Sequence, residues 1–320
     1  MKHDKQMSAQ SIRASVLLPP RQHAPELADA LEPVIRAYLG RVGEVHGRRI
    51  EVSFVDSPAS VDGRVDAARE LVRESHPFAL VASFTDGADA ELASLAEELG
   101  VPLLATMSSH PRSGAVALRH LRDLVAGVEE QARVLAKYAT TELGAAHVVI
   151  ARDDSTLLDG ADAVVVCCPA SSVAAVIRAS HAASVLVPAS LIHPDALASL
   201  AGSRTYVSLP MSMKETTPES LALFEACGGS PAHRLSELAA LASCATFVEA
   251  LTRAGAGATR DALLDALDTL TAFRTGFVPP LTYTPQRHLG STGAYVVNLH
   301  EAGRREVEWV EGEGRRTVRS

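Results

Sequence analysis

The sequence predicts an α/β protein that contains two doubly wound parallel sheets and ends in a β-rich tail. Two observations predict this class. Short β-rich segments alternate with amphipathic helical segments along most of the 320 residues, and the composition combines 47% apolar residues with only 4% aromatic residues. Strands separated by helices pair in parallel through right-handed crossovers, which bury both faces of the sheet. A chain of this length can form two such domains.

The first predicted domain covers residues 1–152 and repeats a strand–helix unit. Its expected strands are 12–18, 49–56, 78–83, 101–107 and 147–151, and its expected helices are 26–42, 65–74, 88–99 and 124–143. In the first helix Leu27, Leu31 and Val34 recur at helical spacing, which indicates one buried face. This domain is therefore expected to be a parallel sheet covered on both sides.

The second predicted domain, residues 153–320, repeats this pattern with fewer elements. Its expected strands are 161–168, 184–187 and 204–209, and its expected helices are 172–180, a short one after Pro194, 219–227, 233–254 and 259–270. Thr259 is a suitable N-cap for the last helix. The β-rich tail, residues 276–320, contains β-like segments at 281–283, 293–300 and 306–310 and is expected to cross back between the domains.

Charge and cysteine usage exclude several classes of function. The net charge is −8, and basic residues do not alternate with aromatic ones, so no nucleic-acid partner is expected. Apolar segments fall short of about 20 residues, which argues against membrane insertion. The first apolar run, residues 14–20, is too short for a signal peptide, so we expect no export signal. The four cysteines lack CxxC spacing, and neither a metal nor a cofactor is expected.

A ligand site is expected at the loops that follow the strands, because open parallel sheets bind ligands beyond the carboxyl ends of their strands. Hydroxyl groups are frequent there, and hydroxyls beside helix N-termini suit a carboxylate-bearing small molecule. The same residues are also ordinary N-caps and turn formers, so that alternative stays open. The candidate ligand-binding residues are Ser83, Phe84, Thr85, Thr106, Met107, Ser108, Ser109, Cys168, Pro169 and Ser190.

Three segments, residues 43–56, 79–106 and 281–299, resemble type I periplasmic binding proteins of the leucine/isoleucine/valine-binding kind. The resemblance implies two lobes joined by hinge strands that close over a ligand, a periplasmic location and the permease of an ABC transporter as partner. It also implies that an amino acid would be held at the matching positions Ser83, Thr85, Ser108 and Ser109.

The chain departs from this family in its second lobe. Between residues 151 and 161 it is shorter than the family by about a helix and a strand, which predicts a shortened second lobe. Cys168 and Pro169 stand where relatives hold an aromatic residue, and Ala189 and Ser190 stand where relatives hold an acidic partner for the ligand's ammonium group. Leucine-like ligands therefore do not follow from the resemblance.

Four functional hypotheses remain open: the substrate-binding component of an amino-acid ABC transporter, a cytoplasmic ligand sensor, an enzyme, and a fold that only mediates protein contacts. An enzyme would use Cys167 or Cys168 with His181 or His193. The run of valines before these cysteines predicts inert, buried thiols, so no catalytic residue is expected.

Two further patterns have ordinary structural interpretations. Cys227 and His233 lack the further ligands of a structural zinc site. Gly255 and Gly257 lie between two predicted helices with no lysine following, unlike a phosphate-binding loop. His288 is interpreted as a structural residue of the tail.

Overall fold

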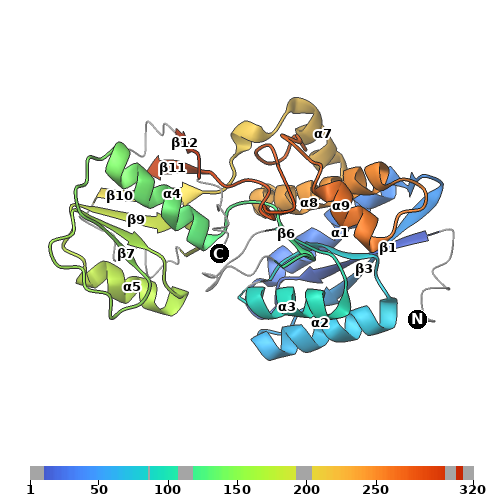
Figure 1. The fold of residues 1–320 in the computed structure, drawn as a ribbon, viewed down its shortest axis with the longest axis horizontal. Coiled ribbons are helices and arrows are strands. Elements are labelled where there is room, and N and C mark those ends of the chain that lie inside the picture. The colour runs from blue at the N-terminus through green and yellow to red at the C-terminus, as the bar shows by residue number, and fades with distance from the viewer. Residues whose placement is uncertain (1–10, 86, 107–117, 192–203, 300–307, 313–320) are drawn as a thin grey trace. The chain divides into compact units, whose positions relative to one another are not determined.

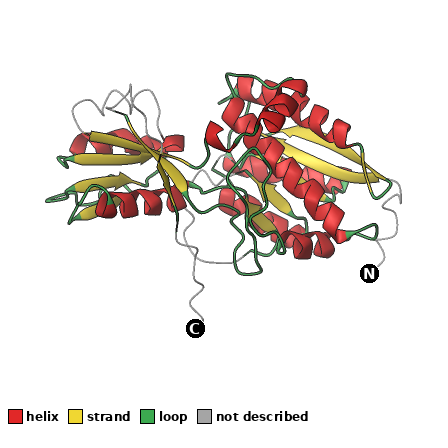
Figure 2. Ribbon diagram, turned by 90° about the horizontal axis from the view of Figure 1, so that it is seen from above, coloured by secondary structure: helices red, strands yellow, loops and turns green. Residues whose placement is uncertain are grey.

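The computed structural model describes residues 11–85, 87–106, 118–191, 204–299 and 308–312 (Figure 1). Contacts divide the chain into two compact units, each built from separated stretches of sequence. Unit 1 comprises residues 1–107, 114–124 and 213–290, and unit 2 comprises residues 108–113, 125–212 and 291–320. Both units combine helices with a central sheet, as Figure 2 shows.

The sheet of unit 1 has the strand order β2-β3-β1-β4-β5-β6. Its strands are β1 (Ser11–Leu18), β2 (Glu44–Val45), β3 (Arg48–Asp56), β4 (Ala79–Ser83), β5 (Leu103–Ala105) and β6 (Leu121–Asp123). All neighbours pair in parallel except β2 and β3, which form an antiparallel pair at one side. The strands β4 and β5 are buried along their whole length, as expected for a parallel sheet covered on both faces.

Six helices belong to unit 1, in the part of the chain that the structure describes. They are α1 (Pro25–Val42), α2 (Val61–Ser75), α3 (Asp89–Leu99), α7 (Pro218–Ala226), α8 (Arg234–Ala254) and α9 (Arg260–Leu267), with a 3-10 turn, η2, at Met213–Glu215. The helices α2 and α3 pack together on one face of the sheet, and α1 and α8 pack together on the other (Figure 1). The predicted cap is confirmed, because the hydroxyl of Thr259 accepts a hydrogen bond from the Ala262 N–H.

Helix α8 is the most apolar long helix in the described part of the chain. With 21 residues it is long enough to cross a membrane, and 67% of its most apolar stretch is buried inside the protein. Cys244 and Phe247 on this helix are completely buried. We therefore interpret α8 as the core helix of unit 1, although its length exceeds what the sequence analysis expected of an apolar segment.

The sheet of unit 2 has the strand order β12-β11-β10-β9-β8-β7. Its strands are β7 (Val148–Ala151), β8 (Ala163–Val166), β9 (Ser184–Pro188), β10 (Arg204–Leu209), β11 (Ala294–Asn298) and β12 (Glu308–Val310). The strands β7 to β10 are parallel, whereas β11 and β12 join them in antiparallel pairs. The tail thus supplies one side of this sheet, which confirms its predicted β-rich character.

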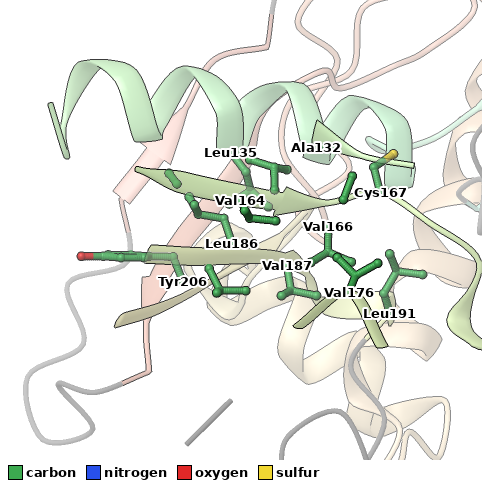
Figure 3. Packing of buried hydrophobic residues seen from close by; sticks show 14 of the residues in the cluster. Ala132, Leu135, Val164, Val166, Cys167, Val176, Leu186, Val187, Leu191 and Tyr206 are labelled. Carbon is green, nitrogen blue, oxygen red and sulfur yellow. The ribbon is translucent and has the colours of Figure 1, made fainter. Parts of the chain in front are cut away.

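The core of unit 2 lies on both faces of its sheet. Helix α4 (Val128–Thr141) covers one face, and α5 (Ala170–Ala179) covers the other. Figure 3 shows Cys167 on the face beneath Ala132 of α4, while Val166 lies with Val176 and Val187 on the opposite side. Successive strand residues alternate between faces, which explains why neighbouring residues enter different halves of the core.

The connection between β7 and β8 contains no helix. Residues 152–162 form only turns and bends, yet the two strands are parallel neighbours. Parallel strands usually need a crossover of a dozen or more residues, most often a helix. Here Asp153 folds the connection by accepting hydrogen bonds from the Ser155 and Thr156 side chains. The structure therefore has no helix between β7 and β8, and the shortening relative to the family stays a prediction.

The division into units differs from the contiguous boundary predicted at residues 152 and 153. Helix α4 precedes that boundary but belongs to unit 2, because it packs on the sheet of unit 2. Helices α7 to α9 follow the boundary but belong to unit 1, where α8 packs on β4. Leu281, predicted to begin a strand, forms only an isolated bridge with Phe273. Strand β6 was not predicted, and the short helix expected after Pro194 lies outside the described residues.

Candidate ligand-binding edges

The parallel strands of unit 1 end together at one edge of the sheet. The Phe84 N–H donates to the carbonyl of Leu17 on β1, and the Thr106 N–H donates to the carbonyl of Ser83 on β4. These bonds bring the loops after β1, β4 and β5 side by side. We call this edge, formed by residues 19–24, 57–60, 84–85, 87–88 and 106, the carboxyl edge of unit 1.

The predicted hydroxyls of Ser83 and Thr85 are buried within unit 1. Ser83 is fully buried, and its hydroxyl accepts from the Leu17 N–H at 3.4 Å and donates to the Val81 carbonyl at 3.3 Å. Thr85 is 1% exposed and donates its hydroxyl hydrogen to the carboxylate of Asp89 at the start of α3. Both hydroxyls therefore fix the loop that they belong to.

A β-bulge shapes β4 just before this loop. The register of β4 against β5 shifts between Leu80 and Ser83, and Ala82 has a φ of 50°, in the left-handed region. The Ala82 N–H donates to the hydroxyl of Ser243 on α8 at 3.0 Å, and that hydroxyl donates to the Leu104 carbonyl. Bulges of this kind are common beside functional sites, where they change the direction of side chains.

Arg64 on α2 connects two loops of this edge and was missed by the sequence analysis. It is 3% exposed, and its guanidinium donates to the carbonyl oxygens of Pro58, Ala59 and Thr85. The signal was present, because Arg64, Ala68 and Leu71 recur at helical spacing and share the buried face of α2. An arginine on a buried helix face needs acceptors, and here the backbone supplies them.

Two of the other ligand-binding residues predicted in the first domain lie at the carboxyl edge of unit 1, and three lie outside the described residues. Phe84 is half-buried at the edge, and Thr106 is 4% exposed at the end of β5. Met107, Ser108 and Ser109 lie outside the described residues. The structure thus brings Ser83, Phe84 and Thr106 together, and the role of each in binding stays a prediction.

The carboxyl edge of unit 2 is formed by the loops after β7, β8, β9 and β10, residues 152–156, 167–169, 189–191 and 210–212. Cys168 is fully buried there, whereas Pro169 is exposed before α5. Ser190 is exposed in the 3-10 turn η1, Ala189–Leu191. The structure therefore places these three predicted residues at one edge with unequal access to solvent.

A charged cluster at the same edge was also missed by the sequence analysis. Glu129, in the first turn of α4, accepts two hydrogen bonds from Arg152, at 2.6 and 2.8 Å. Arg133 donates to the same carboxylate at 3.0 Å, and the Cys167 thiol donates to it at 3.4 Å. The hydrogen bonds from Arg152 lower the pKa of Glu129 to about 2. Only the fold reveals the cluster, because Arg152 and Cys167 lie 23 and 38 residues from Glu129 in the sequence.

The two cysteines of this edge are weak nucleophiles. Burial, with a smaller contribution from the Glu129 charge, raises the pKa of Cys167 to about 12. Burial and the charges of Asp153 and Asp154 raise the pKa of Cys168 to about 11. Both side chains are therefore neutral thiols near pH 7, and thiolate is the form that attacks.

In the described residues, no group of three or more His, Cys, Asp or Glu side chains is placed to hold a metal ion. His288 of the tail instead has a structural environment in unit 1. Its two ring nitrogens lie 2.8 Å from the Leu118 carbonyl and 3.2 Å from the Pro285 carbonyl. Burial lowers the pKa of His288.

Comparisons with known proteins agree with this architecture. Residues 24–157 match the family model described as periplasmic binding protein. No curated protein sequence matches the chain. The chain thus has the two-unit fold of type I periplasmic binding proteins, and its sequence carries the family pattern in that region, as the resemblance predicted.

Solved structures with this fold cover nearly the whole chain. The leucine-binding protein LivK of Thermotoga maritima is 14% identical, with a TM-score of 0.70 over 94% of this chain and 99% of that one. LivJ of Streptococcus pneumoniae, in complex with isoleucine, is 15% identical, with a TM-score of 0.66 over 94% and 100%. A branched-chain amino acid ABC transporter protein of Thermus thermophilus with bound valine is 17% identical, with a TM-score of 0.70 over 95% and 97%. At such low identities the structural similarity establishes the fold alone.

Proposed function

We propose that this chain is a non-catalytic small-molecule-binding protein that serves as the amino-acid-type substrate-binding component of an ABC transporter. The observation that carries the proposal is the agreement in fold, over 94–95% of the chain, with proteins that bind leucine-like amino acids for such transporters. The family match over residues 24–157 supports it from sequence.

The proposed binding residues lie at the carboxyl edges of the two units. In unit 1 the buried hydroxyls of Ser83 and Thr85 hold the loop after β4, and Phe84 and Thr106 of this edge are the proposed contacts. In unit 2 the exposed residues Pro169 and Ser190 are the predicted contacts. Edges of this kind bind ligands because backbone N–H groups and helix N-termini face outward there.

The chemistry of the cysteines supports binding without catalysis. A cleft cysteine was the nucleophile of the enzyme hypothesis, yet Cys167 and Cys168 are fully buried with raised pKa values. An enzyme that uses a thiol lowers its pKa instead, with a nearby cation or a helix N-terminus. Here burial and nearby carboxylates raise the pKa of both thiols.

A thermal-shift screen tests the proposed function. A ligand that binds only the folded protein raises its apparent stability by about 2.7 kcal/mol at a hundredfold excess over its dissociation constant. We expect one of a panel of amino acids and small carboxylates to raise the melting temperature. The double variant S108A/S109A should lose this shift while keeping the melting temperature of the free protein. A panel without any stabilising compound would contradict the proposal.

A further inference from the structure

Arg152 of unit 2 combines a fixed position with access to solvent. It directly follows β7, and its guanidinium meets the Glu129 carboxylate through both terminal nitrogens. The side chain of Arg152 is 54% exposed, whereas that of Glu129 is only 7% exposed. The buried partner therefore holds an arginine whose outer side faces water.

The guanidinium retains hydrogen-bonding capacity in this position. An arginine carries five N–H donors, and each terminal nitrogen uses one of them on Glu129. The described part of the chain provides no further side-chain acceptor for the remaining donors. A planar guanidinium with free donors matches a carboxylate in geometry and charge better than a lysine would.

The charges around Arg152 are of both signs, because Glu130, Asp153 and Asp154 flank the Glu129 ion pair. Glu129 is shared with Arg133, which donates to it from one turn further along α4. Arg133 also lies 3.8 Å from Glu130. Asp153 and Asp154 follow Arg152, and the carboxylate oxygen of Asp153 that accepts hydrogen bonds is occupied by Ser155 and Thr156 of its own turn. Glu129 thus has two cationic partners.

Arg152 follows the carboxyl end of β7, the outermost strand of the unit 2 sheet. The residues after β7 and β8 meet at the same edge, because the Cys167 thiol, after β8, contacts the carboxylate that binds Arg152. The turn connection that replaces a crossover helix leaves residues 152–155 exposed there. Ligands of open parallel sheets lie beyond such strand ends.

We propose that Arg152 binds a carboxylate group of the ligand, with Glu129 as the positioning residue that orients it. The inference rests on the proposed ligand-binding function and restricts the ligand to a carboxylate-bearing class. Arg133 supplies a matched control, since it bonds the same carboxylate from the body of α4.

Isothermal titration calorimetry with paired compounds tests this inference. The probes are L-leucine and succinate, each paired with an amide that carries no carboxylate: L-leucinamide and succinamide (butanediamide). A carboxylate should bind and its amide should not. Loss of a charge-assisted hydrogen bond should weaken binding by about 10- to 100-fold in R152Q. R152K, which keeps the charge without the planar fork, should fall between R152Q and the unchanged protein.

The controls separate a binding role from a structural one. R133Q removes the other partner of Glu129 and should leave the affinity within about threefold. R152Q should remain folded, as circular dichroism can show, because Glu129 keeps Arg133 as a partner. Equal binding of a carboxylate and its amide, or unchanged affinity in R152Q, would overturn the inference and leave the proposed function standing. Binding of none of the four probes, together with a negative thermal-shift screen, would overturn both.

Discussion

The two carboxyl edges use arginine in opposite ways. Arg64 of unit 1 is 3% exposed and donates to backbone carbonyls of two loops, so its charge is used inside the protein. Arg152 of unit 2 is half exposed and is held by a buried carboxylate. The difference teaches that a buried arginine at a carboxyl edge fixes loops, whereas an arginine whose partner alone is buried keeps its outer donors facing water.

Replacement of Arg64 by Ala should produce the largest loss of stability. It removes the donors of three backbone carbonyls, among them that of the buried Thr85, and it empties the space of a side chain that is 3% exposed, so the free energy of unfolding should fall by about 3 kcal/mol. Urea denaturation followed by circular dichroism measures the change. As a control, Arg69→Ala removes an exposed ion pair with Glu98 and should have a much smaller effect. Similar losses in both variants would contradict the structural role of Arg64.

Replacement of Glu129 by Gln should have a smaller effect that depends on pH. The folded-state pKa of about 2 lies below the ordinary value of 4.5, so the carboxylate stabilises the fold above about pH 5. This contribution, up to about 3 kcal/mol, should disappear as the pH falls from 5 towards 2. Denaturation of both proteins across this range measures it. A stability difference that does not depend on pH would show that Glu129 acts only by packing.

Replacement of Ala82 by Gly should raise stability slightly. The left-handed backbone at Ala82 strains any residue with a Cβ, and glycine removes that strain at some cost in unfolded-state entropy. We expect a net gain of about 0.5 kcal/mol in thermal or urea unfolding. The control Ala79→Gly, in the same strand but outside the positive-φ residues, should lower stability. A loss of stability at both positions would argue against strain at the bulge.

Replacement of Leu157 by Ser should have the smallest effect. Leu157 is 84% exposed in the connection between β7 and β8, and changes at exposed positions usually stay within about 0.5 kcal/mol. Leu158, which packs against the core of unit 2, is the matched control, and Leu158→Ser should cost about 1 to 2 kcal/mol. Equal losses in urea unfolding would mean that the connection is packed differently.

Part of the candidate site was predictable from local sequence. The loops after the strands were identified because strand ends and helix starts are readable along the chain, as at Ser83 and Ser190. Arg64 was detectable through the helical spacing that it shares with Ala68 and Leu71. The Glu129–Arg152 pair was not, because its partners are 23 residues apart and only the packing of α4 on β7 brings them together.

The sequence by itself determined the α/β class, the alternation of elements, the Thr259 cap and the helix-free connection after β7, since each depends on near neighbours in the chain. Tertiary structure alone decided which unit each later element joins. Helix α8 lies in unit 1 because its apolar surface packs on β4, and the tail completes the sheet of unit 2 through β11. Arg260 shows the same dependence, because it donates to the carbonyls of Pro77 and Gly100, 160 or more residues away. Contacts at such separations leave no periodic pattern in the sequence, and burial of apolar surface selects them only in the folded chain.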